Sequence, residues 1–159
     1  MALTLLPGAE KSLFERIVKF FEDDDWNFEK DDEEHLLKMG FKGESGQWRC
    51  FARTNEDRRI FSFYSVTDSF VPEDKRAAIA EFITRANYGM IVGNFEMDFS
   101  DGEVRFKTVI AVEDGLLTHE MIKRNVYVNL MMMDQYFPGL MSVMYAGTEP
   151  AEAVAKIED

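Results

Sequence analysis

Apolar and polar residues alternate most clearly between positions 91 and 112. Apolar or small residues hold the odd positions over 91–99, and mostly apolar residues hold the even positions over 104–112. Such alternation is typical of strands with one buried face. Between the two runs, Asp101-Gly102 favours a two-residue turn of type I′, because both central residues of that turn need positive φ. The pattern therefore predicts an antiparallel hairpin.

The two-residue turn also predicts which residues of the hairpin lie opposite each other. The inner-face pairs are Phe99 with Val104, Met97 with Phe106, and Phe95 with Thr108. The outer-face pairs join opposite charges, and they are Asp98 with Arg105 and Glu96 with Lys107. Each opposite-charge pair of this kind contributes about 0.2–1 kcal/mol.

Further strands are predicted upstream of the hairpin. They cover residues 37–42, 47–54 and 59–66, with a short edge strand near 26–28. Together they form an antiparallel meander. A turn at Glu56-Asp57 is expected to place Ala52 opposite Phe61 and Cys50 opposite Phe63.

Apolar residues at helical spacing predict three helices. They cover about 10–21, the segment from Pro72 to just before Gly89, and 118–136, where Thr118 is the cap. The third helix is expected to end at Pro138, because proline breaks the helical hydrogen-bond pattern, with 140–145 as a separate helical segment. Strands grouped between helices are typical of an α+β fold with an antiparallel sheet.

Composition sets the size and the charge of this fold. With 159 residues, 46% hydrophobic content and fourteen Phe, the chain can bury a sizeable core. We expect residues 1–147 to form one domain and 148–159 to be a flexible tail. The net charge of −12 repels nucleic-acid phosphates and anionic lipid. A mild basic cluster stands against this charge, and it comprises Lys38, Lys42, Arg49, Arg53, Arg58 and Arg59.

Several features indicate a cytoplasmic protein. The single cysteine, Cys50, excludes an internal disulfide and suits a reducing compartment. The first eight residues lack the basic start of a signal peptide, and no run reaches the ~18 apolar residues of a membrane span. We therefore expect neither a nucleic-acid nor a membrane partner.

Candidate chemistry is weak. The acidic run from Asp23 to Glu34 has oxygen side chains at the spacing of an EF-hand loop, but Phe28 stands where that loop needs glycine. Cys50, His35 and His119 form the one possible nucleophile–base set, although a cysteine within a strand usually serves packing. No catalytic, metal or cofactor site is predicted, which indicates a protein that is not an enzyme.

A methionine-rich stretch in the third helix allows two interpretations. A helix that is apolar on nearly all sides must be covered on more than one side. It therefore lies deep in the core, or it forms a dimer or peptide-binding surface on which methionines adapt to partners. In the second case Asn125 and Asn129 would mark the wetter edge of the surface. The candidate surface residues are Met121, Val128, Met131, Met132, Met141 and Met144.

The segment from Arg85 to Asp98 resembles a motif of the YbjN family of small bacterial proteins. Trp48 in a strand and Val-Pro-Glu before a helix add to the resemblance, which spans about residues 14–144. The motif residues are Asn87, Gly93, Asn94, Phe95, Glu96 and Asp98. The resemblance implies the fold of type III secretion chaperones, in the order α-β-β-β-α-β-β-α, which commonly dimerises. It also implies a sensory-transduction or stress regulator, and it brings no catalytic residues.

Three functions remain open from the sequence. The first is a non-enzymatic, cytoplasmic, dimeric module that sequesters or presents a protein segment. The second is a sensor that holds a small molecule between sheet and helix. The third is an enzyme of unrecognised type.

Overall fold

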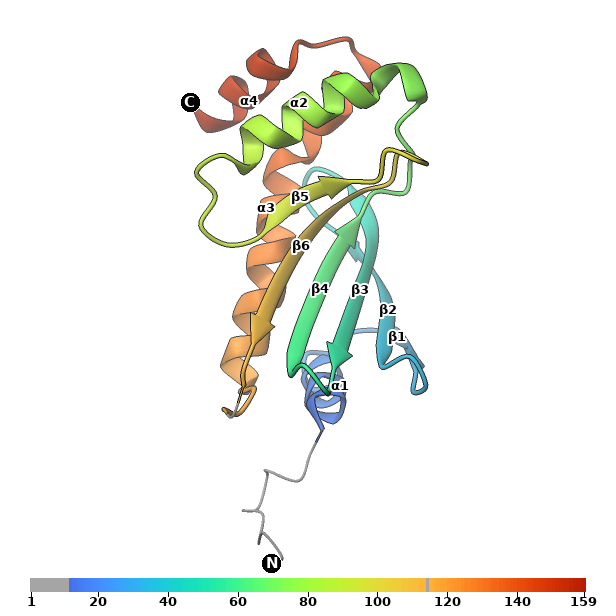
Figure 1. Ribbon diagram of the computed structural model, residues 1–159, viewed down its shortest axis with the longest axis vertical. Helices are drawn as coiled ribbons and strands as arrows, with labels where there is room; N and C mark the ends of the chain where they lie inside the picture. Colours follow the sequence, from blue (N-terminus) through green and yellow to red (C-terminus); the bar gives the residue numbers. More distant parts are fainter. Residues whose placement is uncertain (1–11, 114) are drawn as a thin grey trace, which may run out of the picture.

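A six-stranded antiparallel sheet forms the centre of the computed structural model, which describes residues 12–113 and 115–159 (Figure 1). The strands, in the spatial order β1-β2-β3-β4-β6-β5, are β1 (Phe28–Asp31), β2 (Leu36–Lys42), β3 (Gln47–Asn55), β4 (Ile60–Val66), β5 (Asn94–Met97) and β6 (Val104–Ala111). The helices are α1 (Leu13–Asp23), the 3₁₀ turn η1 (Glu73–Lys75), α2 (Arg76–Asn87), α3 (His119–Tyr145) and α4 (Pro150–Glu158). The predicted α+β class is confirmed. The short edge strand predicted near 26–28 is β1, which begins at Phe28, and α4 is an addition to the predicted order.

Helices α1 and α3 cover the same face of the sheet. Phe21 of α1 stacks on Phe63 of β4 with ring centroids 6.1 Å apart. On the same face, the Ser65 hydroxyl of β4 donates to Asn129 Oδ1 of α3 at 2.6 Å. Helices α2 and α4 pack together at one end of the molecule (Figure 1). Within the described residues, no helix covers the opposite face of the sheet, which we call the open face.

The register between β3 and β4 differs from the prediction by two residues. Ala52 lies opposite Phe63 and Cys50 lies opposite Ser65, because the turn spans residues 56–59. Glu56 in this turn caps α1: its carboxylate accepts the backbone N–H groups of Leu13 and Phe14 at 3.0 and 2.9 Å. The turn is therefore shaped by a long-range contact that a local turn rule does not contain.

The hairpin register differs from the prediction in the same way. Its pairs are Phe95 with Phe106, Glu96 with Arg105, and Met97 with Val104, so the predicted opposite pairs are wrong. Glu96 nevertheless forms an ion pair with Lys107 at 3.2 Å as well as with Arg105.

A four-residue turn causes this difference. Residues 99–102 are closed by the Asp98 N–H, which donates to Glu103 O at 2.9 Å. The Asp98 carboxylate accepts from the Ser100 N–H at 2.8 Å and from its hydroxyl at 2.6 Å, and these bonds lower the Asp98 pKa. Phe99, predicted inside, is 60% exposed in the turn.

Helix α3 continues through Pro138, so the predicted break is wrong. Thr118 caps the helix as predicted, with its hydroxyl oxygen accepting the Met121 N–H at 3.1 Å. Gly139 lies so close to α2 and α4 that a β-carbon there would be 2.8 Å from the Phe82 ring and 2.5 Å from Ile157. Burial of this segment outweighs the ~3 kcal/mol cost of an internal proline.

The residues after Thr148 do not form the predicted flexible tail. Pro150–Glu158 forms α4, whose Ala153 and Val154 are buried. The Tyr136 hydroxyl donates to Glu158 Oε1 at 2.8 Å and links the end of α4 to α3. Over residues 12–113 and 115–159, no helix combines the length and apolar character needed to cross a lipid bilayer.

Candidate functional site

The structure does not bring the histidines to Cys50. His35 stacks on Phe14 at 5.1 Å, and its carbonyl accepts the N–H of Thr54, which lies four residues along β3 from the cysteine. His119 lies at the start of α3 with its ring 5.0 Å from that of Phe20. Burial raises the pKa of the Cys50 thiol to about 12, so the thiol stays protonated at neutral pH. The arrangement supports packing rather than nucleophilic chemistry.

Three raised pKa values predict that the fold loses stability in alkali. Burial raises the pKa of the Cys50 thiol to about 12. A hydrogen bond to Asp24 raises the pKa of Tyr127 to about 12, and burial together with a hydrogen bond to Glu158 raises the pKa of Tyr136 to about 12. The unfolded chain releases these protons near 9.0 for the thiol and 10.0 for the phenols, so the free energy of unfolding falls above pH 9. Thermal melts from pH 8 to 11 should show a falling Tm, with a shallower fall for Tyr136→Phe. A constant Tm in the wild-type protein would contradict the prediction.

One residue of the acidic run, Asp24, links the end of α1 to α3. The Asp24 carboxylate accepts the Trp26 indole N–H at 2.9 Å and the Tyr127 hydroxyl at 2.6 Å. In the described part of the chain, no three His, Cys, Asp or Glu side chains gather in a way that could hold a metal ion.

Asn125 and Asn129 lie between α3 and the sheet, and the prediction that they mark a wetter edge is wrong. Both are buried. Asn129 Nδ2 donates to the carbonyls of Phe63 and Phe106 at 2.9 and 3.1 Å, and also to Thr108 Oγ1 at 3.1 Å. The polar groups between sheet and helix therefore bond to one another.

Asn87, the first residue of the family motif, protects the β5 edge of the sheet. Its Oδ1 accepts the Phe95 N–H at 2.7 Å, and its Nδ2 donates to the Phe95 carbonyl at 3.0 Å. These are the backbone groups of Phe95 through which another strand could otherwise pair with β5. At the opposite edge, β1 is short and carries charges at Glu29, Lys30 and Asp31. Pairing with another chain is thus disfavoured at both edges.

Gly93 in the same motif lets the chain approach β6 closely. Its φ is +78°, and a β-carbon there would lie 2.7 Å from the Phe106 ring and 2.9 Å from the Lys107 carbonyl. The positive φ interrupts the alternation before β5, so Ile91, predicted inside a strand, is 97% exposed.

The loop between α2 and β5 forms an apolar groove with α3. Its volume is about 480 Å³, and Figure 1 shows the loop projecting from the side of the molecule. Tyr88 on the loop is 90% exposed. We call this surface the apolar groove, and its main lining residues are Tyr88, Met90, Ile91, Val92, Val128 and Met132.

The candidate surface residues of α3 are divided by the fold. Val128 and Met132 line the apolar groove. Met131 is 68% exposed but does not line the groove, while Met121 and Met141 are half-buried and pack against the core. Met144 is buried in the core. The exposed loop of the groove was not predicted, although five successive residues without charge, 88–92, beside Gly93 are a signal for it.

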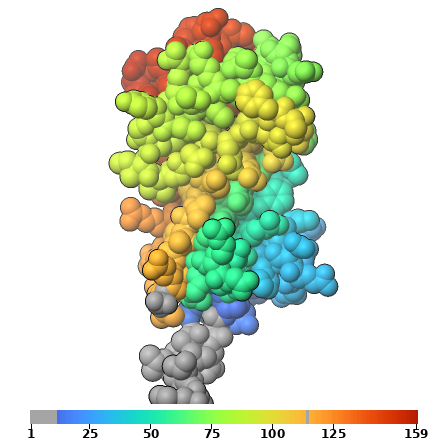
Figure 2. Space-filling view, in the orientation of Figure 1, coloured from blue at the N-terminus to red at the C-terminus, as the bar shows by residue number. Residues whose placement is uncertain are grey.

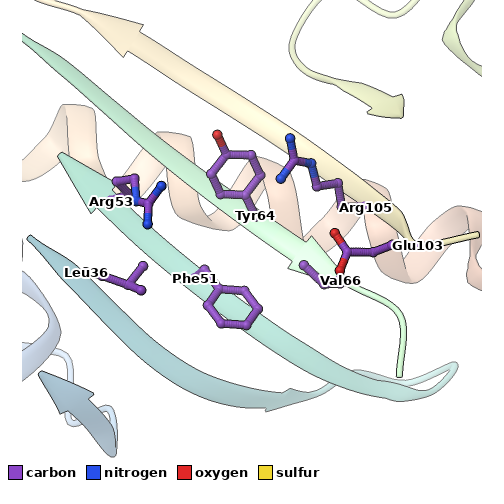
Figure 3. Close-up of a pocket in the computed structure, with 7 residues that line it drawn as sticks. All are labelled: Leu36, Phe51, Arg53, Tyr64, Val66, Glu103 and Arg105. Atoms are coloured by element: carbon purple, nitrogen blue, oxygen red, sulfur yellow. The ribbon is translucent and has the colours of Figure 1, made fainter. Parts of the chain in front are cut away.

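The open face of the sheet, which is turned toward the viewer in Figure 2, carries a basic and aromatic surface (Figure 3). Phe51 of β3 lies opposite Tyr64 of β4. The Arg49 guanidinium is 5.7 Å from the Phe51 ring centroid, and that of Arg105 is 4.6 Å from the Tyr64 ring centroid. A hollow of about 270 Å³ is lined by Phe51, Tyr64 and Arg105 among others, with α3 behind the sheet (Figure 3).

This surface gathers bases that are distant in the sequence. Four members of the predicted basic cluster occupy outward positions of β2 and β3 on this face, and β6 adds two more bases. We call it the basic sheet face, and its bases are Lys38, Lys42, Arg49, Arg53, Arg105 and Lys107. The alternation in each strand identifies the outward positions, but only the β4–β6 pairing brings the bases of β6 beside those of β3.

Comparison with a solved structure agrees with this architecture. The crystal structure of YbjN from E. coli has a TM-score of 0.57 and 12% identity, over 74% of this chain and 83% of that one. One chain of the ExsC–ExsE complex has a TM-score of 0.46 and 14% identity, over 76% of this chain and 90% of that one. No curated protein matches the chain.

The family comparison covers most of the described residues. A family model described as "Putative bacterial sensory transduction regulator" matches residues 14–141. The match extends from α1 into the last part of α3 and includes the motif that protects the β5 edge. The chain therefore belongs to the YbjN family.

Proposed function

We propose that this chain is a non-enzymatic, cytoplasmic regulator that binds another protein and that it acts as a homodimer joined through the apolar groove. The observation that carries the proposal is the exposure of Ile91 and Tyr88 beside the apolar side chains of Val128 and Met132. Exposed apolar clusters of this kind mark interaction sites, and methionine adapts readily to a partner surface. Family membership supports the regulatory role.

A second copy of the chain suits the groove because the projecting loop between α2 and β5 lies directly beside the groove. A two-fold axis can place the loop of each copy against the groove of the other, which makes the contact self-complementary. Protection of β5 by Asn87 favours such a face contact over edge pairing. The alternative of a small ligand between sheet and helix has less support, since Asn125 and Asn129 already bond to the sheet there.

Ile91→Asp and Met132→Asp are expected to convert the dimer into a monomer. A buried unpaired carboxylate in the interface costs several kcal/mol, which raises the dimer Kd by more than about a hundredfold. Light scattering should give twice 18.4 kDa for the wild-type protein and 18.4 kDa for both variants. Ile91 is nearly fully exposed, so its variant tests the interface even if Met132→Asp unfolds.

Met131→Asp serves as the matched control. Met131 is exposed on the same helix, but it does not line the groove. Its variant should remain dimeric. A monomeric wild-type protein, or a dimer that Ile91→Asp leaves intact, would overturn the proposed dimer.

A further inference from the structure

We infer that the basic sheet face is a docking site for an acidic amphipathic helix of a partner protein. The inference extends the protein-binding role proposed above, but it uses a surface separate from the apolar groove. The charge of the face, the spacing of side chains across the sheet, and the pairing of the backbone groups in the middle strands each contribute to it.

The charge of this face is opposite to that of the chain. The whole protein carries −12, whereas the outward positions of β2, β3 and β6 carry six bases and no acid. The outward acids of the sheet, Glu29, Asp31 and Glu96, are on the two edge strands. A partner with carboxylates would therefore be attracted to the middle of the sheet and repelled by much of the remaining surface.

Half of these bases are available to a partner. Arg49 pairs with Asp68 at 3.1 Å, and Glu96 pairs with both Arg105 and Lys107. Among the residues that the structure describes, no carboxylate lies within 4.0 Å of Lys38, Lys42 or Arg53.

The order of side chains across the sheet matches the width of a helix. One row runs from Lys38 through Phe51 and Tyr64 to Lys107 on four neighbouring strands. Strands are about 4.8 Å apart, so the two lysines are separated by roughly 14 Å with the rings between them. A helix is about 10–12 Å in diameter. A helix with its apolar stripe on the rings would thus place glutamates within reach of the unpaired Lys38 on one flank and of Lys107, which Glu96 also contacts, on the other.

A helix suits this face better than an extended peptide. The backbone groups in the middle strands already pair with neighbouring strands, so a segment lying on the face finds no backbone partners. An extended segment would leave its own N–H and C=O groups unpaired above Phe51 and Val66, whereas a helix satisfies them internally.

The same face is less suited to single-stranded nucleic acid. Glu103 beside the hollow and the net charge of −12 would repel a continuous run of phosphates.

The test is a fluorescence anisotropy titration with a labelled peptide of about 18 residues, or five helical turns, with a leucine stripe flanked by glutamates. We expect the full-length protein to bind it, and the double variant Lys38→Glu with Arg53→Glu to bind it at least about tenfold more weakly. Phe51→Ala should also weaken binding. A second double variant, Lys123→Glu with Arg124→Glu, makes the same charge change at exposed positions of α3 and should leave binding unchanged.

Several results would overturn the inference. An equal loss of affinity in the two double variants would mean that peptide binding depends only on the net charge of the protein. Binding of an oligothymidylate in place of the peptide would assign the face to nucleic acid, and binding of neither probe would leave the face without the proposed partner. Circular dichroism checks the fold of each variant.

Light scattering on the same samples separates this inference from the dimer proposal. A dimer that does not bind the peptide contradicts the docking site alone. A monomer that binds it contradicts the groove interface alone.

Discussion

Replacing Asn129 with leucine is expected to lower the free energy of unfolding by about 3–5 kcal/mol. The side chain is fully buried and connects α3 to two strands. Leucine has a similar volume but no polar atoms, so the Ser65 hydroxyl would lose its acceptor and the carbonyls of Phe63 and Phe106 would lose a donor. Each buried polar group left unpaired costs about 1–3 kcal/mol.

Urea denaturation followed by circular dichroism measures this loss, and Gln135→Leu is the control. Gln135 lies on the same helix but is exposed, so its substitution should change the free energy of unfolding by less than about 0.5 kcal/mol. If Asn129→Leu lost no more than Gln135→Leu, the hydrogen bonds between helix and sheet would not be a major source of stability.

The faces of the strands could be predicted from the sequence, but the registers of the β3–β4 and β5–β6 hairpins could not. A shift of two residues moves a strand along its neighbour without turning its side chains to the other face. Phe95 and Phe106 are therefore buried in either register. Local turn rules favoured the shortest loop, whereas contacts of the turn at 99–102 with the start of α2 select a longer one: Arg76 Nη1 donates to the Phe99 carbonyl at 3.1 Å.

The orientation of α3 could not be predicted from the sequence, for a related reason. Its residues are apolar on nearly all sides, so the hydrophobic pattern does not identify the face that meets the sheet. Asn125 and Asn129, predicted at the wetter edge of a partner surface in one of the two interpretations, are buried because the sheet supplies matching donors and acceptors. Such complementarity requires residues about twenty to sixty positions away, such as Thr108 and Ser65.

The two candidate binding surfaces were predicted to different extents. Val128 and Met132 of the groove follow from the methionine-rich pattern, but the loop opposite them was assigned to a strand because alternation continues up to Gly93. Four bases of the basic sheet face belong to the predicted basic cluster, while Arg105 and Lys107 join them only through the pairing of β6 with β4. Both surfaces are made by contacts between distant segments.

Gly102→Ala is expected to lower the free energy of unfolding by about 3–5 kcal/mol, from two causes that add. Gly102 has φ +85°, which costs an alanine about 1–2 kcal/mol. In addition, a β-carbon there would overlap the Val71 carbonyl oxygen and lie 2.8 Å from the Val71 nitrogen. These atoms are backbone, and the Val71 N–H donates to the Gly102 carbonyl at 2.8 Å, so relief of the overlap requires separation of the turn from the start of α2.

Gly147→Ala separates the two causes. Gly147 also has a positive φ, +68°, but a β-carbon there would meet nothing within 4 Å. Its substitution should therefore cost only the conformational part, about 1–2 kcal/mol, in the same urea titration. If Gly102→Ala loses more, the difference between the two losses measures the free energy of the contact between the turn and the start of α2. This contact selects the four-residue turn and, with it, the register of β5. Equal losses in the two variants would mean that the turn can move away from the start of α2 at little cost in free energy. The register would then have to be set by Asn87 and Gly93 at the other end of β5.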